Sequence, residues 1–336
     1  MNDDAGALLE TYLKPLQDFL KPDDVTELVI NRAYEVGVER KGGWEWHEMP
    51  DLDIKWLYTL AKLAAGYTKQ DVTDSHPICS TTLPNGERCQ IVLPPAVPEG
   101  TVSFTIRKPS KADFSLDDLA AAGLFDEVRT VTDDLSDDEN ELVRLRDAGE
   151  WQAFLDLAVR SRRNIIISGP TGSGKTTLSK ALIRKIPDHE RLLTIEDARE
   201  LTVPQRNVVH LVYSKDGQAR AQTTAKDMLE SALRMRPDRI LLQELRDGTA
   251  FFYVRNVNSG HPGSITTVHA DSAELAFEQL TLLVKESQGG ADLARADIRS
   301  LLYILVDVVI QMKKIDGKFL MTEVYYDPLR KRQASN

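Results

Sequence analysis

Residues 164–177 read Asn-Ile-Ile-Ile-Ser-Gly-Pro-Thr-Gly-Ser-Gly-Lys-Thr-Thr. Within this stretch, residues 169–176 match the P-loop pattern G-x-x-x-x-G-K-[ST]. The isoleucines at 165–167 predict a short buried strand before the loop, and apolar residues at helical spacing from Leu178 to Ile186 predict a helix after it. The alternative, an ordinary glycine-rich turn before a helix, does not explain why both flanking patterns are present. The stretch therefore predicts a phosphate-binding loop between a strand and a helix.

The predicted loop supplies several kinds of phosphate ligand. Its glycines allow backbone N–H groups to converge on phosphate oxygens, and the N-terminus of the following helix adds partial positive charge. Lys175 would reach the β- and γ-phosphates, and Thr176 would bind magnesium. The nucleotide-binding residues predicted from the loop are Gly169, Pro170, Thr171, Gly172, Ser173, Gly174, Lys175, Thr176 and Thr177.

The composition is that of a globular protein long enough for two domains. The chain has 336 residues, of which 42% are hydrophobic and 28% are charged. Its net charge of −10 argues against a general nucleic-acid binder, which normally needs a basic surplus, so we expect no direct nucleic-acid binding as its main function. Cys79 and Cys89 do not form a C-x-x-C pair, which predicts reduced structural thiols rather than a zinc site.

The sequence also predicts where in the cell the protein is found. It has no run of about 18 apolar residues that would suggest a membrane span. The N-terminus, Met-Asn-Asp-Asp, lacks the basic start and apolar stretch of a signal peptide. We therefore expect a cytoplasmic protein, which is compatible with peripheral contact with a membrane.

Three regions differ in their pattern along the chain. Residues 1–110 predict a smaller α+β domain, with a hairpin turn at Asn85-Gly86. Residues 111–150 are rich in Asp and Glu with little periodicity, which predicts an acidic linker with short helices. Residues 151–336 alternate strand and helix patterns and close with an antiparallel hairpin around Asp316-Gly317, which predicts an α/β domain with a mainly parallel sheet.

A P-loop binds nucleotide, but hydrolysis also needs a positioned water, magnesium and charge stabilisation of the transferring phosphoryl group. Three later segments are candidates for these roles. In the first, the apolar strand 192–195 ends in Glu196 and Asp197, at the sheet edge where open α/β folds bind ligands. Glu196 or Asp197 would hold the magnesium shell or a water; the alternative is a solvated turn or a helix cap.

The second segment, 239–247, is a buried strand that runs directly into Gln243 and Glu244. It resembles a Walker B strand, with Glu244 placed where the attacking water would be polarised. The magnesium-binding Asp that usually ends such a strand is missing, because Gln243 precedes the glutamate. This absence shifts the metal role toward Thr176, water ligands and Glu196.

The third segment, 259–270, contains His269 at the end of a predicted strand. It lies at the same sheet edge as the P-loop and Glu244, where a histidine would sense the γ-phosphate through a hydrogen bond. The alternative is a histidine with a purely structural role. For Arg246 the sequence leaves two partners open, a phosphate or Asp247.

Together these segments resemble one family of enzymes, the secretion ATPases, which are the RecA-like motors of type II and type IV secretion and of pilus assembly. Residues 104–110 resemble the junction segment of the type IV branch, the hexameric traffic ATPases. The assembly ATPases of type II systems typically carry a tetracysteine zinc module, which a chain with two cysteines cannot supply. The segments similar to the family's Walker A, Asp box, Walker B and His box are 169–176, 194–197, 233–242 with 244–246, and 259–270.

The resemblance implies a homohexameric ATPase that uses ATP and Mg²⁺ and works with inner-membrane components of a secretion system. In this family the nucleotide sits between the two domains, which implies that Arg107 approaches the phosphates; the alternative is a surface arginine at a strand end. The implied catalytic residues are Lys175, Glu244, Glu196 and His269, and the implied metal ligands are Thr176 and Glu196.

We therefore expect a type IV secretion or conjugation motor that couples Mg-ATP turnover to substrate transport or pilus assembly at the inner membrane. The nearest alternative is a pilus-retraction or type II secretion ATPase of the same superfamily. More distant alternatives are a nucleic-acid translocase and a nucleotide-gated ring with negligible turnover. Glu244 at the strand end argues against the last of these.

Overall fold

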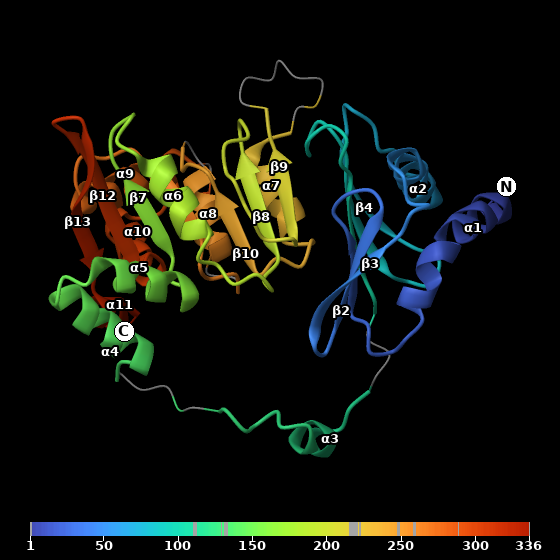
Figure 1. Ribbon diagram of the computed structural model, residues 1–336, viewed down its shortest axis with the longest axis horizontal. Coiled ribbons are helices and arrows are strands. Elements are labelled where there is room, and N and C mark those ends of the chain that lie inside the picture. Colours follow the sequence, from blue (N-terminus) through green and yellow to red (C-terminus); the bar gives the residue numbers. More distant parts are fainter. Residues whose placement is uncertain are drawn as a thin grey trace.

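The computed structural model describes residues 2–109, 113–128, 130, 134–214, 221, 223–246, 249–257, 260–287 and 289–335. Ser110, Asp247 and Ser259, which belong to the sequence motifs above, lie outside the described residues. Figure 1 shows two domains side by side, with the connecting segment running separately below them. Among the described residues, no helix is both long enough and apolar enough to cross a lipid bilayer.

The first domain is an antiparallel sheet with two helices on one face (Figure 1). Its six strands follow the order β3-β2-β1-β6-β5-β4. Asp53 caps the second of these helices by accepting a hydrogen bond from the Trp56 backbone N–H at 2.7 Å. Cys79 and Cys89 are free thiols buried in the core of this domain. The elements are α1 (Asn2–Leu20), β1 (Glu27–Ile30), β2 (Glu35–Arg40), β3 (Gly43–Glu48), α2 (Ile54–Tyr67), β4 (Ile78–Thr82), β5 (Arg88–Val92) and β6 (Ser103–Arg107).

The connecting segment contains α3 (Leu116–Ala121) and α4 (Asp137–Asp147). Helix α3 has no buried residues, and Figure 1 shows it away from both domains. Helix α4 instead packs on the second domain, where Leu142 and Leu145 are buried in the same core cluster as Phe154. The packing of α4 therefore favours a second domain that begins before residue 151.

The second domain has its sheet between two layers of helices (Figure 1). The strands form two groups, β10-β8-β9 and β11-β7-β12-β13, which a parallel bridge between Glu244 and Thr267 joins. The elements are α5 (Trp151–Arg160), β7 (Ile165–Ser168), α6 (Lys175–Ile183), β8 (Leu192–Glu196), β9 (Val208–Val212), α7 (Ala225–Ala232), β10 (Arg239–Leu242), α8 (Thr249–Val257), β11 (Ile265–Val268), α9 (Ala273–Glu286), α10 (Arg295–Leu305), β12 (Val308–Ile315), β13 (Lys318–Tyr326) and α11 (Pro328–Ser335).

The strand directions confirm the predicted fold class, α/β with a mainly parallel sheet. Strand β7 pairs in parallel with β11 on one side and β12 on the other, and β8 pairs in parallel with β10 and β9. Only the β12–β13 hairpin is antiparallel among these pairs. Because parallel strands present their carboxyl ends at one edge, residues after β7, β8, β10 and β11 meet there.

Buried polar side chains join the two domains along the β9 edge. The Arg191 guanidinium donates hydrogen bonds to Asn31 Oδ1 at 2.9 Å and to Thr105 Oγ1 at 3.1 Å in the first domain. It also donates to Asn207 Oδ1 at 2.6 Å and to the Met235 carbonyl at 2.8 Å in the second domain. One fully buried cation is thus satisfied by acceptors from both domains, which fixes how they pack.

Candidate active site

The P-loop connects β7 to α6 through glycines in conformations that other residues rarely adopt. Gly169 has a φ of +152° and Gly174, which precedes α6, has a φ of +92°. A methyl group added to Gly169 would lie 2.4 Å from the carbonyl oxygen of Met312 on β12, so a side chain does not fit there. The loop is therefore packed tightly against the neighbouring strand while it turns its backbone toward the cavity at the sheet edge.

Lys175 lies largely buried at the start of α6. Its Nζ donates hydrogen bonds to the carbonyl oxygens of Gly169 at 2.6 Å and Pro170 at 3.0 Å, and it lies 3.5 Å from His269 Nδ1. Burial lowers the pKa of the lysine below its ordinary value, although the nearby Glu244 carboxylate opposes this shift. The ammonium group therefore lies against the loop, next to the histidine that the sequence placed at the same edge.

Glu244 lies at the centre of a charged network. Its Oε1 is 2.9 Å from His269 Nε2, and its Oε2 accepts a hydrogen bond from Arg246. Arg246 in turn contacts Asp197 Oδ2 at 3.2 Å. Burial disfavours the charged carboxylate, but the hydrogen bond from Arg246 and the neighbouring positive charges outweigh it and lower the pKa of Glu244. Glu244 is therefore ionised at neutral pH and can accept a hydrogen bond from water.

These groups line one cavity of about 620 Å³ at the carboxyl edge of the sheet. It has the size of a small-molecule site, and its polar groups converge from the ends of four strands and the start of one helix. Its lining consists of Thr171, Gly172, Ser173, Gly174, Lys175, Thr176, Thr177, Asp197, Ala198, Glu200, Gln243, Glu244, Arg246, Thr267, His269 and Phe319.

Glu196 does not line this cavity, and its predicted place at the metal needs correction. The side chain is fully buried, and Oε1 accepts hydrogen bonds from the backbone N–H groups of Glu200 at 2.8 Å and Leu201 at 2.7 Å. Its Oε2 accepts a hydrogen bond from the Thr194 hydroxyl at 3.0 Å and lies 3.6 Å from His210 Nδ1. Burial disfavours ionisation, but these partners outweigh it and lower the pKa of Glu196. Its oxygens are therefore engaged in shaping the loop after β8.

Arg107 also lies outside the cavity of its own chain, contrary to the contact that the sequence implies. Its side chain is 69% exposed at the end of β6, and its Nε lies 3.4 Å from Glu27 Oε1. All described lining residues come from the second domain. The strand end carries Arg107 to the surface of the first domain, where it does not line the cavity of its own chain.

The cavity offers oxygen ligands that suit Mg²⁺. Thr176 lines it in the first turn of α6, and the carboxylates of Asp197 and Glu244 line it from the opposite side. No group of three or more His, Cys, Asp or Glu side chains within the described ranges could hold a metal ion by itself. This arrangement fits Mg²⁺, which is usually held by substrate phosphates and waters with one or two protein oxygens.

For Arg246 the sequence leaves the partner open between a phosphate and Asp247, and Phe319 is not predicted from the sequence as a site residue. Arg246 bridges Asp197 and Glu244, a pairing across two strand ends that no local pattern contains. Phe319 reaches the cavity from the β12–β13 hairpin, far along the chain from the loop. Only the strand order of the sheet, which places β12 next to β7, brings this residue to the site.

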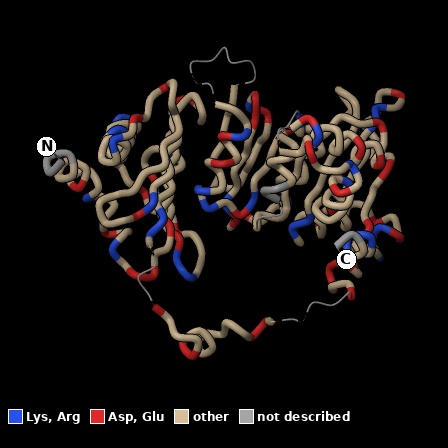
Figure 2. Tube along the Cα trace, turned by 180° about the vertical axis from the view of Figure 1, so that it is seen from behind, with Lys and Arg blue, Asp and Glu red and all other residues tan. Residues whose placement is uncertain are grey.

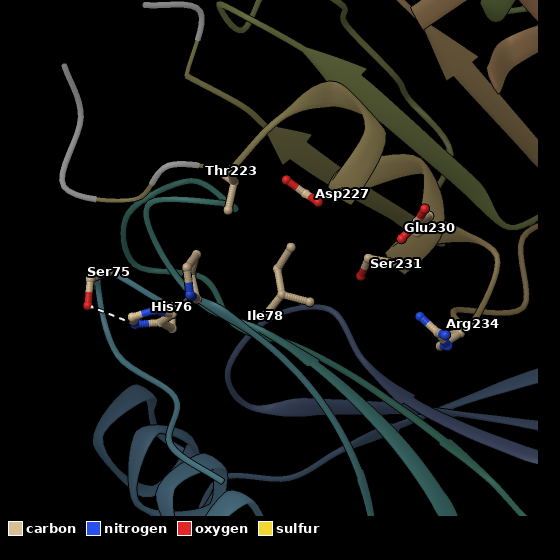
Figure 3. Close-up of a pocket in the computed structure, with 9 residues that line it drawn as sticks. Ser75, His76, Ile78, Thr223, Asp227, Glu230, Ser231 and Arg234 are labelled. Atoms are coloured by element: carbon tan, nitrogen blue, oxygen red, sulfur yellow. Dashed lines mark hydrogen bonds between the residues drawn. The ribbon is translucent and has the colours of Figure 1, made fainter. Parts of the chain in front are cut away.

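A separate cavity of about 370 Å³ lies between the domains (Figure 3). His76 and Ile78 line it from the first domain, and Asp227, Glu230 and Arg234 line it from α7 and its C-terminal end. Asp227 is already engaged in capping α7. This cavity shares no lining residue with the P-loop cavity, so we assign the candidate chemistry to the latter.

Comparisons with known proteins identify the family of this chain. The model of the Type II/IV secretion system protein family matches residues 59–314. The chain is 55% identical to the Type IV secretion system protein VirB11 of Bartonella henselae, covering 99% of this chain and 96% of that protein. It is 45% identical to the VirB11 protein of Brucella suis, covering 98% and 93%.

A solved structure extends the similarity to the whole fold. The crystal structure of the VirB11 ATPase from the Brucella suis type IV secretion system, in complex with sulphate, superimposes with a TM-score of 0.94 at 44% identity, covering 99% of this chain and 98% of that one. The chain therefore belongs to the Type II/IV secretion system protein family, and within it to the traffic ATPases of type IV secretion.

Proposed function

We propose that this chain is the ATP-hydrolysing motor of a type IV secretion system and that it works as a homohexameric ring at the inner membrane. The observation that carries the proposal is the convergence of Lys175, His269 and Glu244 on one cavity of about 620 Å³ beside the P-loop. Phosphoryl transfer to water needs a group that binds the phosphates and a second group that positions the water. Here a P-loop lysine lies near an ionised carboxylate that belongs to another strand end.

Each group has a role that its position supports. Lys175 and the backbone N–H groups of the P-loop bind the phosphates, and Glu244 accepts a hydrogen bond from the attacking water and orients it. His269 lies between Lys175 and Glu244 and would sense the γ-phosphate. Thr176 and Asp197 would hold Mg²⁺, which when bound neutralises charge on the phosphate oxygens.

The position of Arg107 is consistent with a ring. This arginine is exposed and lies outside the cavity of its own chain, so a contact with phosphate has to be made to the cavity of a neighbouring subunit. A heterologous contact of this kind forms a ring when its rotation closes. Arg107 would then make each site depend on the subunit next to it.

The distribution of charge favours protein partners over nucleic acid. Figure 2 shows Lys and Arg interspersed with Asp and Glu along the chain in both domains. Together with the net charge of −10, this argues against nucleic acid as the main partner. Inner-membrane components of the secretion system as partners, and peripheral attachment at that membrane, are proposed from the resemblance to the type IV secretion ATPases. A strong stimulation of ATPase activity by DNA at physiological salt would instead favour a translocase.

Two measurements test this function. Light scattering with and without nucleotide should give a mass six times that of one chain, whereas a stable monomer would contradict the ring. In a strain that lacks the gene, wild-type protein should restore secretion and the Lys175→Ala variant should not. The motor role fails if Lys175→Ala secretes normally, because the lysine is the central phosphate ligand of the proposed site.

A further inference from the structure

Phe319 is an aromatic side chain at the edge of the nucleotide cavity with no role so far. It is the second residue of β13, it lines the P-loop cavity, and 54% of its surface is exposed. We infer that Phe319 is the surface on which the planar base of the bound nucleotide rests. This inference rests on the proposed function, since it concerns the nucleotide that the P-loop holds.

The hairpin holds the Phe319 ring against the P-loop. The pairing of β12 with β13 shifts register between Gln311 and Met312, and such bulges bend a strand and re-aim the side chains beyond it. The Met312 carbonyl then packs on Gly169, and the Phe319 ring packs on Gly174, where an added methyl group would lie 3.1 Å from Phe319 Cδ1. The hairpin thus forms a side wall of the loop, with the ring beside the start of α6.

The order of strands decides which end of a nucleotide faces this wall. Strand β7, which carries the P-loop, has β11 and then β10 on one side and β12 and then β13 on the other. Glu244 and His269 follow β10 and β11, so the terminal phosphate points to that side. The rest of the nucleotide has to extend from the loop in the opposite direction, where Phe319 is the aromatic side chain that lines the cavity.

The chemistry of the ring suits a base better than a sugar or phosphate. Bases stack on aromatic rings, and the contact tolerates different bases because each has a π-face. The Lys314 ammonium lies 5.5 Å from the ring centroid, a cation–π contact that helps to hold the ring in place. An alternative role for Phe319 is to brace Gly174, in which case it would support phosphate binding rather than contact the base.

The test compares ligands with and without a base on the full-length protein. Titration calorimetry would measure affinity for ADP and for inorganic tripolyphosphate in wild type, Phe319→Ala and Phe319→Trp. The matched control is Leu320→Ala, the next residue on β13, which is 41% exposed and, by strand alternation, on the other face of the hairpin.

Loss of one stacking contact should weaken ADP binding roughly tenfold in Phe319→Ala and leave tripolyphosphate binding unchanged. Phe319→Trp and Leu320→Ala should bind ADP as wild type does. The KM for ATP should rise as ADP affinity falls in Phe319→Ala, while kcat stays within about twofold, because the base contact is the same in the ground and transition states.

Unchanged ADP affinity in Phe319→Ala would overturn the inference, and so would equal losses for ADP and tripolyphosphate, which would indicate a brace on the loop. The inference and the proposed function fail separately. A wild-type protein that binds ADP without hydrolysing ATP would contradict the motor, while the comparison of the two ligands would still decide the role of Phe319.

Discussion

At the scale of single residues, the carboxylates of this protein differ sharply in what surrounds them. Glu196 is saturated by backbone N–H groups and a hydroxyl, whereas Asp197, the next residue, lines the cavity and contacts Arg246. The first therefore positions the loop after β8, and the second lines the cavity in which we place the nucleotide and its metal ion.

This assignment predicts different effects of two neighbouring substitutions. Glu196→Gln can keep an acceptor oxygen for the Glu200 and Leu201 N–H groups, but it removes the charge and replaces the acceptor facing the Thr194 hydroxyl with a donor. This change should cost about 1–3 kcal/mol of unfolding free energy. The Mg²⁺ concentration that gives half-maximal ATPase activity should be the same for Glu196→Gln as for wild type. Asp197→Asn should instead raise that Mg²⁺ concentration while unfolding in urea as wild type does. A shift in Mg²⁺ dependence for Glu196→Gln alone would restore the glutamate to the metal.

Glu27 is a buried carboxylate whose loss of hydration is not made up by hydrogen bonds and nearby positive charges. It is almost completely buried, and its Oε2 has no hydrogen-bond partner in the part of the chain that the structure describes. Burial raises the pKa of Glu27 to about 7, although the positive charge of Arg107 opposes this shift. Because the folded state keeps the proton that the unfolded state releases, Glu27 should cost stability progressively as the pH rises from about 4.5 to about 7.

Removing this charge should change the pH dependence of stability. Glu27→Gln should match wild type near pH 5 and exceed it by up to roughly 3 kcal/mol at pH 8. Urea unfolding followed by the fluorescence of Trp44, Trp46 and Trp56 reports on the first domain. If both proteins lose stability equally between pH 5 and pH 8, the conclusion that Glu27 is buried in its protonated form is wrong.

At the scale of elements, the P-loop depends on the strand beside it. Gly169 packs so closely on Met312 that no side chain fits, whereas a methyl group added to Gly172 would have no neighbour within 4 Å, even though its φ is +75°. Gly172→Ala should therefore cost only the backbone strain, about 1–2 kcal/mol.

Gly169→Ala should cost more than that strain and should also weaken ADP binding, because the loop and β12 have to separate. Thermal unfolding and ADP titration of the two variants measure both effects. Equal losses in the two proteins would show that the close contact with β12 does not shape the loop.

The elements also show how far local patterns predict this structure. The strand, loop and helix around Lys175 were predictable because the signals are contiguous in the sequence, and the alternation of strands and helices predicted the parallel sheet. Which of Glu196 and Asp197 lines the cavity was not predictable, because the two residues are adjacent at the end of one strand. The answer depends on how residues 197–201 fold back, since two of their backbone N–H groups bind the Glu196 carboxylate. The position of Phe319 could not be predicted for another reason: it depends on a bulge in β13 and on the order of strands.

At the scale of the whole molecule, the two domains are fixed to each other by buried hydrogen bonds around Arg191, while Arg107 is exposed and does not line its own cavity. If Arg107 serves a neighbouring subunit, two inactive variants should complement each other. Rings mixed from equal parts of Arg107→Ala and Lys175→Ala contain cavities with an intact lysine next to an intact arginine.

About a quarter of the sites in random mixed rings should have both groups, so ATPase activity should rise well above that of either variant alone. The controls are rings that contain only one of the two variants and are put through the same mixing procedure. An arginine that works within its own chain, or has only a structural role, would give no recovery on mixing.

The central claim, that Glu244 orients the water attacking a nucleotide held by the P-loop, is tested most directly by phosphate release from Mg-ATP with wild-type and Glu244→Gln protein, together with their ATP affinities. We predict that wild type turns over ATP, and that Glu244→Gln binds ATP about equally well but hydrolyses it roughly 100-fold or more slowly, as expected for loss of a general base. A Glu244→Gln protein that retains wild-type turnover would contradict the account.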